Sequence, residues 1–345
     1  MVRKARSGTR GGANGDSGNV TLIDVARVAG VAPMTVSRAL NRPELVRQAT
    51  QKKVLDAVRA TGYVPNMLAG GLASSRSRLV ALLLPTIASS IFADTVQALM
   101  DELTDAGYQT LIGLTGYSVS REEALVEALL GRRPDAIVLA GTDHSAATVA
   151  RLEQARIPVV EIWDLTDRPI DMVVGFSHEQ VGQAVARHLM RKGYRRFAAV
   201  SVDDPRGLRR CKSLRAELAA NGLLECPLEV LPAPATLAAG RQGLAKLLET
   251  LRPEVVVCSS DTLAEGALME AASRDLRVPE DLAVMGFGDL SMAAQLHPAL
   301  STVKVGGAEI GRRTAQALLA RFEPGANDTP VRIDTGFTII DRDSA

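Results

Sequence analysis

Short apolar runs alternate with longer amphipathic stretches from position 79 onward. The apolar runs predict buried strands over 79–84, 109–114, 136–140, 159–162, 197–200, 255–258 and 282–286. Stretches such as 95–106, where apolar residues recur at helical spacing, predict helices between them. Apolar strands with intervening helices are typical of parallel sheets covered on both faces. This many strands predicts two lobes, each with its own sheet.

A different pattern precedes them, because residues 20–61 predict three short helices. Thr21 is suited to cap a helix over 22–29, which Gly30 would end. Pro33 suits the first turn of a second helix that runs to about Leu40, because its missing N–H costs nothing there. A third helix is predicted over 48–60.

These patterns predict four segments and a fold class. Residues 1–19 are predicted to form a disordered basic tail, 20–64 an all-α domain, 65–78 a linker, and 79–345 an α/β domain of two doubly wound parallel-sheet lobes.

The charge is divided unevenly along the chain, although the formal net charge is only +1. Residues 1–78 hold 13 Lys and Arg against 4 Asp and Glu, whereas residues 79–345 hold 27 against 35. A basic head on an acidic body is expected where only the head meets nucleic acid. Three widely spaced cysteines, the lack of a long apolar run and the lack of a signal peptide predict a cytoplasmic protein with no membrane partner.

The segment 24–41 carries the most specific chemistry. Ala26, Val31, Val36 and Leu40 are spaced so that two short helices pack across a tight turn, which leaves Thr35, Ser37, Arg38 and Asn41 on the polar side of the second helix. In a helix-turn-helix protein that side enters the major groove, and Met34 and Arg38 are the best candidates to read bases. The plain alternative is a helical hairpin that only caps a surface.

Residues 20–73 resemble the head of the lactose/galactose repressor family, and the resemblance continues through the rest of the chain. It implies that residues 20–64 form a helix-turn-helix DNA-binding domain, that 65–78 form a hinge, and that 79–345 form an effector-binding and dimerisation domain like a periplasmic binding protein. The N-lobe would take about 79–176 and 307–336, and the C-lobe about 177–306 and 337–345. The resemblance also implies phosphate contacts from Thr21, Thr35, Ser37, Asn41, Thr50, Tyr63 and Asn66, and base-reading positions at Pro33, Met34 and Arg38. The run Met34–Arg38 is similar to gluconate-type members of the family.

Residues 66–73 match the family's hinge, which folds on cognate DNA and inserts a leucine into the minor groove. The resemblance places Ala69 in this DNA-contacting hinge and Leu72 at the inserted position. Gly70 and Gly71 disfavour a helix by about 1 kcal/mol each relative to Ala, so a flexible spacer is the alternative.

Effector contacts are expected at strand carboxyl ends, in the crevice between the lobes. The candidates from the first lobe are Ser89, Ile91 and Phe92 after the first strand and Glu161 and Trp163 at the end of a later one. An aromatic face often packs on sugar C–H groups, although the single tryptophan is equally consistent with a core residue.

Further candidates follow the strand that ends at Gly175 and the strands of the second lobe: Phe176, Ser177, Arg210, Ser260, Asp261 and Phe287. Ser177 and Asp261 are alternatively helix caps, and Arg210 is alternatively a solvated base. The resemblance places Arg210 at the family's effector-binding arginine, whereas Gly288 replaces a frequent acidic ligand residue. An arginine without that carboxylate favours an acidic sugar such as gluconate or a ketogluconate.

These features predict a repressor of transcription that binds double-stranded operator DNA and is controlled by a sugar or sugar-acid effector. We expect a homodimer, because one short reading helix is too small for operator specificity. No catalytic motif, metal-ligand spacing or cofactor motif is found, so neither an enzyme, a metal nor a cofactor is expected. The alternative is a two-lobed solute-binding protein without a role on DNA, which salt-dependent binding to duplex DNA would exclude.

Overall fold

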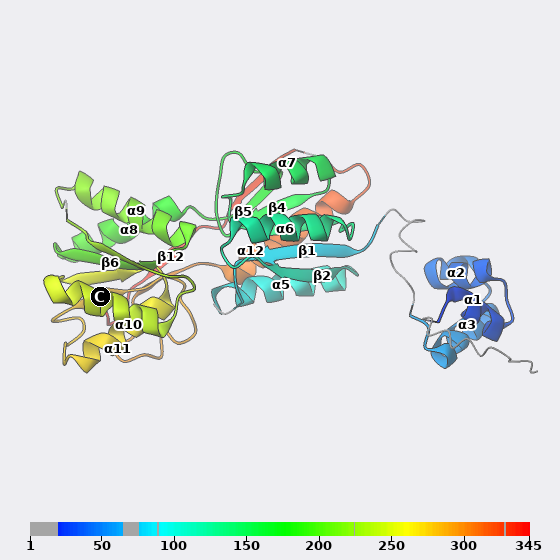
Figure 1. The fold of residues 1–345 in the computed structure, drawn as a ribbon, viewed down its shortest axis with the longest axis horizontal. Helices are drawn as coiled ribbons and strands as arrows, with labels where there is room; N and C mark the ends of the chain where they lie inside the picture. The colour runs from blue at the N-terminus through cyan, green and yellow to red at the C-terminus, as the bar shows by residue number, and fades with distance from the viewer. Residues whose placement is uncertain (1–19, 65–75, 88–89, 224, 328) are drawn as a thin grey trace, which may run out of the picture. The chain divides into compact units, whose positions relative to one another are not determined.

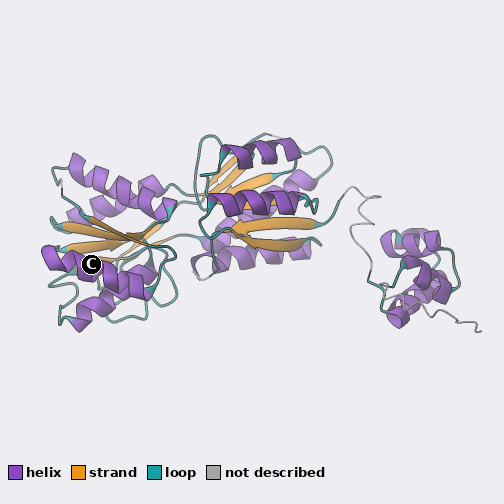
Figure 2. Cartoon of the chain, viewed as in Figure 1, coloured by secondary structure: helices purple, strands orange, loops and turns teal. Residues whose placement is uncertain are grey.

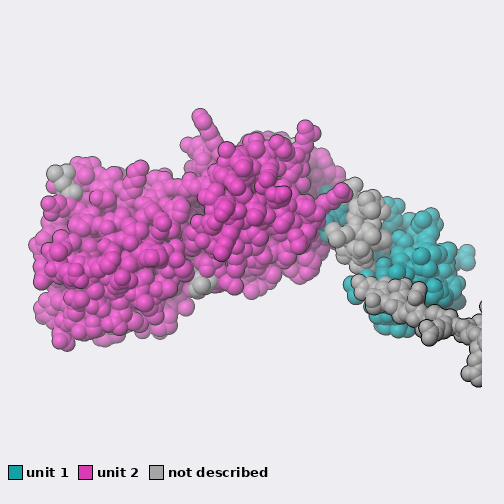
Figure 3. Space-filling view, in the orientation of Figure 1, with its two compact units in different colours: residues 1–77 teal, residues 78–345 magenta. Residues whose placement is uncertain are grey.

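The structure is a computed structural model that describes residues 20–64, 76–87, 90–223, 225–327 and 329–345. The chain divides into two compact units, residues 1–77 and 78–345, which are coloured separately in Figure 3. The predicted tail, most of the predicted hinge and the candidates Asn66, Ala69, Leu72 and Ser89 lie outside the described residues.

The first unit contains the three predicted helices, α1 (Leu22–Ala29), α2 (Pro33–Asn41) and α3 (Gln48–Thr61), with a short 3-10 turn, η1 (Pro43–Leu45). Asp24 accepts hydrogen bonds from the Thr21 backbone N–H (3.0 Å) and hydroxyl (2.6 Å), which fixes the start of α1. Gly30 ends that helix with a φ of 66°, a conformation that glycine adopts without strain. Pro33 is the first residue of α2, as predicted.

A small core holds these helices together. Its buried side chains are Val25 and Ala26 from α1, Val36 and Ala39 from α2, and Val54 and Ala57 from α3. Val31 and Leu40 pack on this core half-buried, as the helix-turn-helix interpretation expects.

The first lobe of the second unit is built on a six-stranded parallel sheet in the order β11-β5-β4-β3-β1-β2. Its strands are β1 (Leu79–Leu84), β2 (Gln109–Leu114), β3 (Ala136–Ala140), β4 (Val159–Ile162), β5 (Met172–Gly175) and β11 (Val331–Asp334). Apolar side chains of α5 (Ala93–Asp105) and α12 (Gly307–Phe322) pack on one face, and those of α6 (Val119–Leu130) and α7 (Ala146–Ala155) on the other. The sheet is therefore buried on both sides, as its continuous apolar runs predict.

The second lobe has a four-stranded parallel sheet in the order β7-β6-β8-β9. Its strands are β6 (Phe197–Val202), β7 (Leu228–Leu231), β8 (Val255–Cys258) and β9 (Ala283–Met285). Figure 1 shows α8 (His178–Arg191) and α9 (Pro205–Ala220) on one face, and α10 (Leu237–Thr250) and α11 (Asp261–Ser273) on the other. Figure 2 shows the same layers, helix over strand over helix, and confirms the predicted fold class.

The chain passes between the lobes three times: from β5 to α8, from β10 (Thr302–Lys304) to α12, and from β11 to β12 (Thr338–Ile340). β10 and β12 pair antiparallel, so two of the crossing segments are hydrogen-bonded to each other. These strands, with β7 and β11, were not among the predicted runs because they are short or only half-buried.

Candidate functional site

The exposed face of α2 carries the candidate base-reading residues. Met34 is 63% exposed, and Arg38, one turn further along, is also exposed. Thr35 and Ser37 are half-buried, while Val36 turns into the core. Residues four apart share one face of a helix, so Met34 and Arg38 are presented together.

The other candidates of this unit lie around that face. Pro33 is exposed at the start of α2, and Asn41 is the last residue of the helix. Thr21 is exposed at the start of α1, Thr50 is half-buried in the first turn of α3, and Tyr63 packs half-buried on the core just after α3. The first turns of α1 and α3 thus carry a hydroxyl each, which suits phosphate contacts.

A cavity lies in the second unit where strands of both lobes end. Six of the predicted effector contacts line it: Ile91, Phe92, Trp163, Arg210, Ser260 and Phe287. The remaining lining residues are Tyr117, His178, Val202, Asp204, Arg206, Ala235 and Ser259. Carboxyl ends of parallel strands are the usual ligand-binding edge of such sheets.

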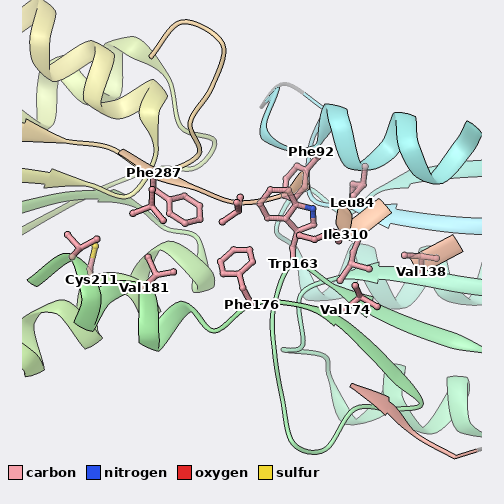
Figure 4. Close-up of a cluster of buried hydrophobic side chains, with 14 of the residues drawn as sticks. Leu84, Phe92, Val138, Trp163, Val174, Phe176, Val181, Cys211, Phe287 and Ile310 are labelled. Carbon is pink, nitrogen blue, oxygen red and sulfur yellow. The ribbon is translucent and has the colours of Figure 1, made fainter. Parts of the chain in front are cut away.

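Aromatic side chains form a continuous wall across the two lobes (Figure 4). The Trp163 ring meets Phe92 edge-on at 5.1 Å between centroids and Phe176 at 5.9 Å. Trp163 donates its indole N–H to Thr95 Oγ1 (3.0 Å) and adopts a φ of 66°, which is costly for a bulky residue. It is 3% exposed and yet lines the cavity, so it serves both as core and as wall.

Arg210 is buried in this cavity with its guanidinium 3.7 Å from the centroid of the Phe287 ring. Nη2 donates to the Ser259 carbonyl (2.6 Å) and Nη1 donates to His178 Nδ1 (2.9 Å). Burial lowers the pKa of Arg210 to about 10, so the group remains charged at neutral pH. The alternative of a solvated base does not fit this environment.

His178 connects that arginine to the first lobe. Its Nε2 lies 2.9 Å from the Trp163 carbonyl, which can only accept, while Arg210 can only donate to Nδ1. The ring is therefore neutral with its proton on Nε2. Burial, and then the charge of Arg210, hold the pKa of His178 well below its usual value, in agreement with this tautomer.

Four of the candidates do not line the cavity. Phe176 is fully buried behind Trp163, and Ser177 caps α8 by accepting from the Gln180 N–H (3.1 Å). Asp261 accepts from Thr302 Oγ1 (2.5 Å) and the Leu290 N–H (2.8 Å), and so braces the loop after β9. Its pKa is raised by burial to about 6.

Glu161 is the fourth, buried beneath the loop that follows β4. It accepts from the Ile170 N–H (2.7 Å) and lies 3.8 Å from His144, which also bonds Glu122 at 2.8 Å. Burial raises the pKa of Glu161 to about 7. Burial lowers the pKa of His144, but the hydrogen bond and charge of Glu122 outweigh this effect and raise it overall.

Sequence reasoning did not select five polar residues that line the cavity: Tyr117, His178, Asp204, Arg206 and Ser259. Asp204 caps α9 by accepting from the Gly207 N–H (3.2 Å), directly after β6. A helix start at a strand's carboxyl end is the signal that would have identified Asp204 and Arg206. A second cavity shares Tyr117, Asp204 and Arg206 with the first.

One arginine from the second lobe bridges to the first. Arg209 donates to Asp164 Oδ2 (2.7 Å) and also bonds Asp143. Asp164 is fully buried, and Thr142 donates to the same carboxylate (3.0 Å). Burial raises the pKa of Asp164, while the charge of Arg209 opposes that rise. This pair ties the two lobes together beside the cavity.

Two classes of feature were not found in the part of the chain that the structure describes. These residues contain no group of three or more His, Cys, Asp and Glu side chains arranged to hold a metal ion. None of their helices is both long enough and apolar enough to span a bilayer.

A helix-turn-helix unit and a two-lobed unit with a cavity at the carboxyl ends of its strands together define a transcriptional regulator with a DNA-binding domain and an effector-binding domain. The profile described as "Bacterial regulatory proteins, lacI family" matches residues 21–66, and the "Periplasmic binding protein-like domain" profile matches residues 186–345. The chain belongs to the LacI family of transcriptional regulators.

Named relatives and solved structures agree with that assignment. The chain is 38% identical to the HTH-type transcriptional regulator GntR of Pseudomonas aeruginosa over 95% of this chain and 96% of the relative. It is 31% identical to the HTH-type transcriptional regulator IdnR of Escherichia coli over 93% and 97% of the two chains. A crystal structure of a LacI-family regulator from Silicibacter pomeroyi superposes with a TM-score of 0.87 at 33% identity, over 94% and 99% of the chains. The relatives are named as regulators of transcription, not as enzymes.

Proposed function

We propose that this regulator is a repressor, without enzymatic activity, that binds a pseudo-palindromic operator as a homodimer in the cytoplasm. A single helix of nine residues offers few base contacts, and a twofold dimer doubles them. Light scattering at micromolar concentration should therefore give a dimer. A monomer with full operator affinity would contradict this part of the proposal.

Met34 and Arg38 read base edges, with Pro33 beside them, in the proposed complex. Thr21, Thr35, Ser37, Asn41, Thr50 and Tyr63 contact phosphates, with Asn66, Ala69 and Leu72 completing the contacts from the hinge. The exposed face of α2 supports this division, because its polar residues surround the two exposed side chains.

The effector is a sugar acid of the gluconate or ketogluconate type, held between the lobes. Arg210 carries this part of the proposal: it is a buried, charged guanidinium that stacks on Phe287 in the cavity. Ile91, Phe92, Trp163 and Ser260 supply further contacts, because each lines the same cavity. Ser89, Glu161, Phe176, Ser177 and Asp261 are proposed to act from the surrounding loops.

Effector and operator are coupled through the lobes. A ligand shifts a conformational equilibrium only through its different affinity for the two states, so an inducer binds the DNA-free form more tightly. The expected coupling is about 1–3 kcal/mol, or about 5- to 150-fold, and it is reciprocal.

The test is a fluorescence-anisotropy titration of a labelled operator duplex in the presence of gluconate, 2-ketogluconate or glucose. We expect either acid, but not glucose, to change operator affinity by that factor. A response to neutral glucose and to neither acid would contradict the acidic-effector assignment.

A further inference from the structure

The cavity contains a second buried arginine, Arg206, which was not among the predicted effector contacts. Its guanidinium carbon lies 5.4 Å from the centroid of the Phe92 ring, and the residue is 8% exposed. Its Nε and Nη2 reach Asp204 Oδ1 only at 3.4 Å. Nη1 is buried and finds no hydrogen-bond partner among the described residues. Arg206 is thus desolvated and only loosely bonded.

Arg210 is more fully engaged. Two of its nitrogens bond Ser259 and His178, whereas its buried Nε is without a partner among the residues that the structure describes. Buried donors are nearly always hydrogen-bonded, and leaving one unpaired costs about 1–3 kcal/mol. Two such donors, on two guanidinium groups that line one cavity, suit the two oxygens of a carboxylate.

The net charge of the cavity lining limits the number of negative charges on the ligand. Arg206, Arg210 and Asp204 are the charged groups in the lining, because His178 is neutral, so their sum is +1. One carboxylate balances this charge. A second anionic group would be buried without a counter-charge, which is costly.

The adjoining cavity adds hydrogen-bonding groups and no unpaired charge. It shares Tyr117, Asp204 and Arg206 with the first cavity, and Thr115 and Ser118 add hydroxyls to its lining. Its further carboxylates, Glu122 and Asp143, are already bonded to His144 and Arg209. A hydroxylated chain that extends from the arginines into this space meets hydrogen-bonding groups, whereas a phosphate or second carboxylate finds no free cation there.

We propose that Arg206 and Arg210 together hold the one carboxylate of the effector, and that Asp204, by reducing the charge of the lining to +1, makes the site reject a second negative charge. This assignment rests on the proposed acidic effector. It adds the direction in which the effector lies in the cavity and the number of negative charges that the effector carries. The effector is then a monoanionic polyhydroxy acid with its carboxylate toward α9.

Isothermal titration calorimetry on the full chain tests whether Arg206 and Arg210 hold the carboxylate. The two ligands have the same carbon chain, but gluconate carries one carboxylate and glucarate carries two. We expect gluconate to bind the wild type at least about tenfold more tightly than glucarate. Arg206→Gln should weaken gluconate by about 30-fold or more, because it removes a charge-assisted donor. Arg215→Gln, an exposed arginine on the same helix, is the matched control and should leave the affinity unchanged.

Asp204→Asn tests the charge limit. Asparagine keeps the cap to the Gly207 N–H but removes the negative charge, so the preference for gluconate over glucarate should fall about tenfold. Thermal melting and operator binding check that each variant is folded.

The outcomes separate the two levels of the proposal. If Arg206→Gln leaves gluconate binding unchanged, or Asp204→Asn does not alter the preference for gluconate, the proposed roles of these two residues are wrong. The proposal of an acidic effector is unaffected by either result. Failure of gluconate and 2-ketogluconate alike to bind the folded wild type overturns the acidic effector itself.

Discussion

The two units use arginine in opposite ways. Arg38 is an exposed residue of α2 in the first unit, one turn from the exposed Met34. Arg206 and Arg210 are buried in the second unit against the rings of Phe92 and Phe287. An exposed arginine keeps its hydration until a polyanion arrives, whereas a buried one is held ready for a small enclosed anion.

The size of each core explains the difference. The first unit's core consists of small side chains, all Val or Ala, between three short helices. Such a core leaves no room for a desolvated charge, and burying one would cost more than the unit's stability. The second unit has large apolar clusters on both faces of its sheets, which support buried charges with hydrogen bonds and aromatic contacts.

Salt should produce the largest contrast between the two sites. We expect operator affinity to fall about 10³- to 10⁵-fold as salt rises from about 50 to about 200 mM, because phosphate contacts release counterions. Effector affinity should change by less than about tenfold, since buried charges are little screened. Anisotropy measures the operator affinity and calorimetry measures the effector affinity in the same buffers. Equal salt dependence of the two affinities would contradict the contrast between an exposed and a buried site.

Arg210→Ala should have the next largest effect, on the effector alone. We expect affinity for the acidic effector to fall about 100-fold or more, because a buried charge partner is lost. Operator binding without effector should persist, since the mutation lies in the other unit. Lys212→Ala, an exposed residue of the same helix, is the control. Retained effector response in a folded Arg210→Ala protein would contradict the assignment.

Arg38→Ala should act on the operator alone and by a smaller amount. The expected loss is about 1–3 kcal/mol on the specific site, with relaxed preference at one base pair per half-site. Thr35→Ala should instead weaken binding evenly across sequences, as expected for a phosphate contact. Competition assays with single-base operator variants measure the difference. An unchanged specificity ratio in Arg38→Ala would show that Arg38 does not read a base.

The last effect concerns pH and the stability of the second unit, not binding. Glu161 has a folded pKa of about 7, above its ordinary value of 4.5, so its contribution to stability is complete below pH 4.5 and is lost as pH rises through 7. Glu161→Gln should remove that loss and stabilise the unit at pH 8 by about 3 kcal/mol relative to the wild type.

Thermal melts between pH 4.5 and 8 measure this difference. His144 and Asp164 titrate nearby, but comparing the wild type with the variant largely cancels contributions that the two share. Glu153→Gln, an exposed carboxylate on α7, is the control. Identical pH profiles for the wild type and Glu161→Gln would contradict the expectation.

Local pattern was enough to predict most of the fold. The helix starts at Thr21 and Pro33 follow from capping and from the fixed φ of proline, and the first strand from its six consecutive apolar residues. The strands β10 and β12 in the crossing segments were not predicted, because three residues are too few to show a hydrophobic periodicity.

The site was harder to predict, because burial of a charged residue is decided by distant parts of the chain. Arg206, Arg209 and Arg210 look alike in sequence, yet Phe92, Asp164 and Phe287 give each a different environment. Ser177 caps α8, as the alternative interpretation of the sequence expected, whereas α11 is capped by Ser260 and not by Asp261. Asp261 instead braces the loop after β9. No local pattern distinguishes a brace from a ligand contact.

Trp163 is the only tryptophan in the sequence, and it lines the cavity with its indole almost completely shielded from solvent. Its ring lies between Phe92 and Phe176, and its carbonyl is bound to His178. The unmodified chain therefore carries its own optical probe, whose emission comes from one position. A shielded indole emits toward the blue, so any rearrangement of the lobes that wets this ring will appear as a red shift.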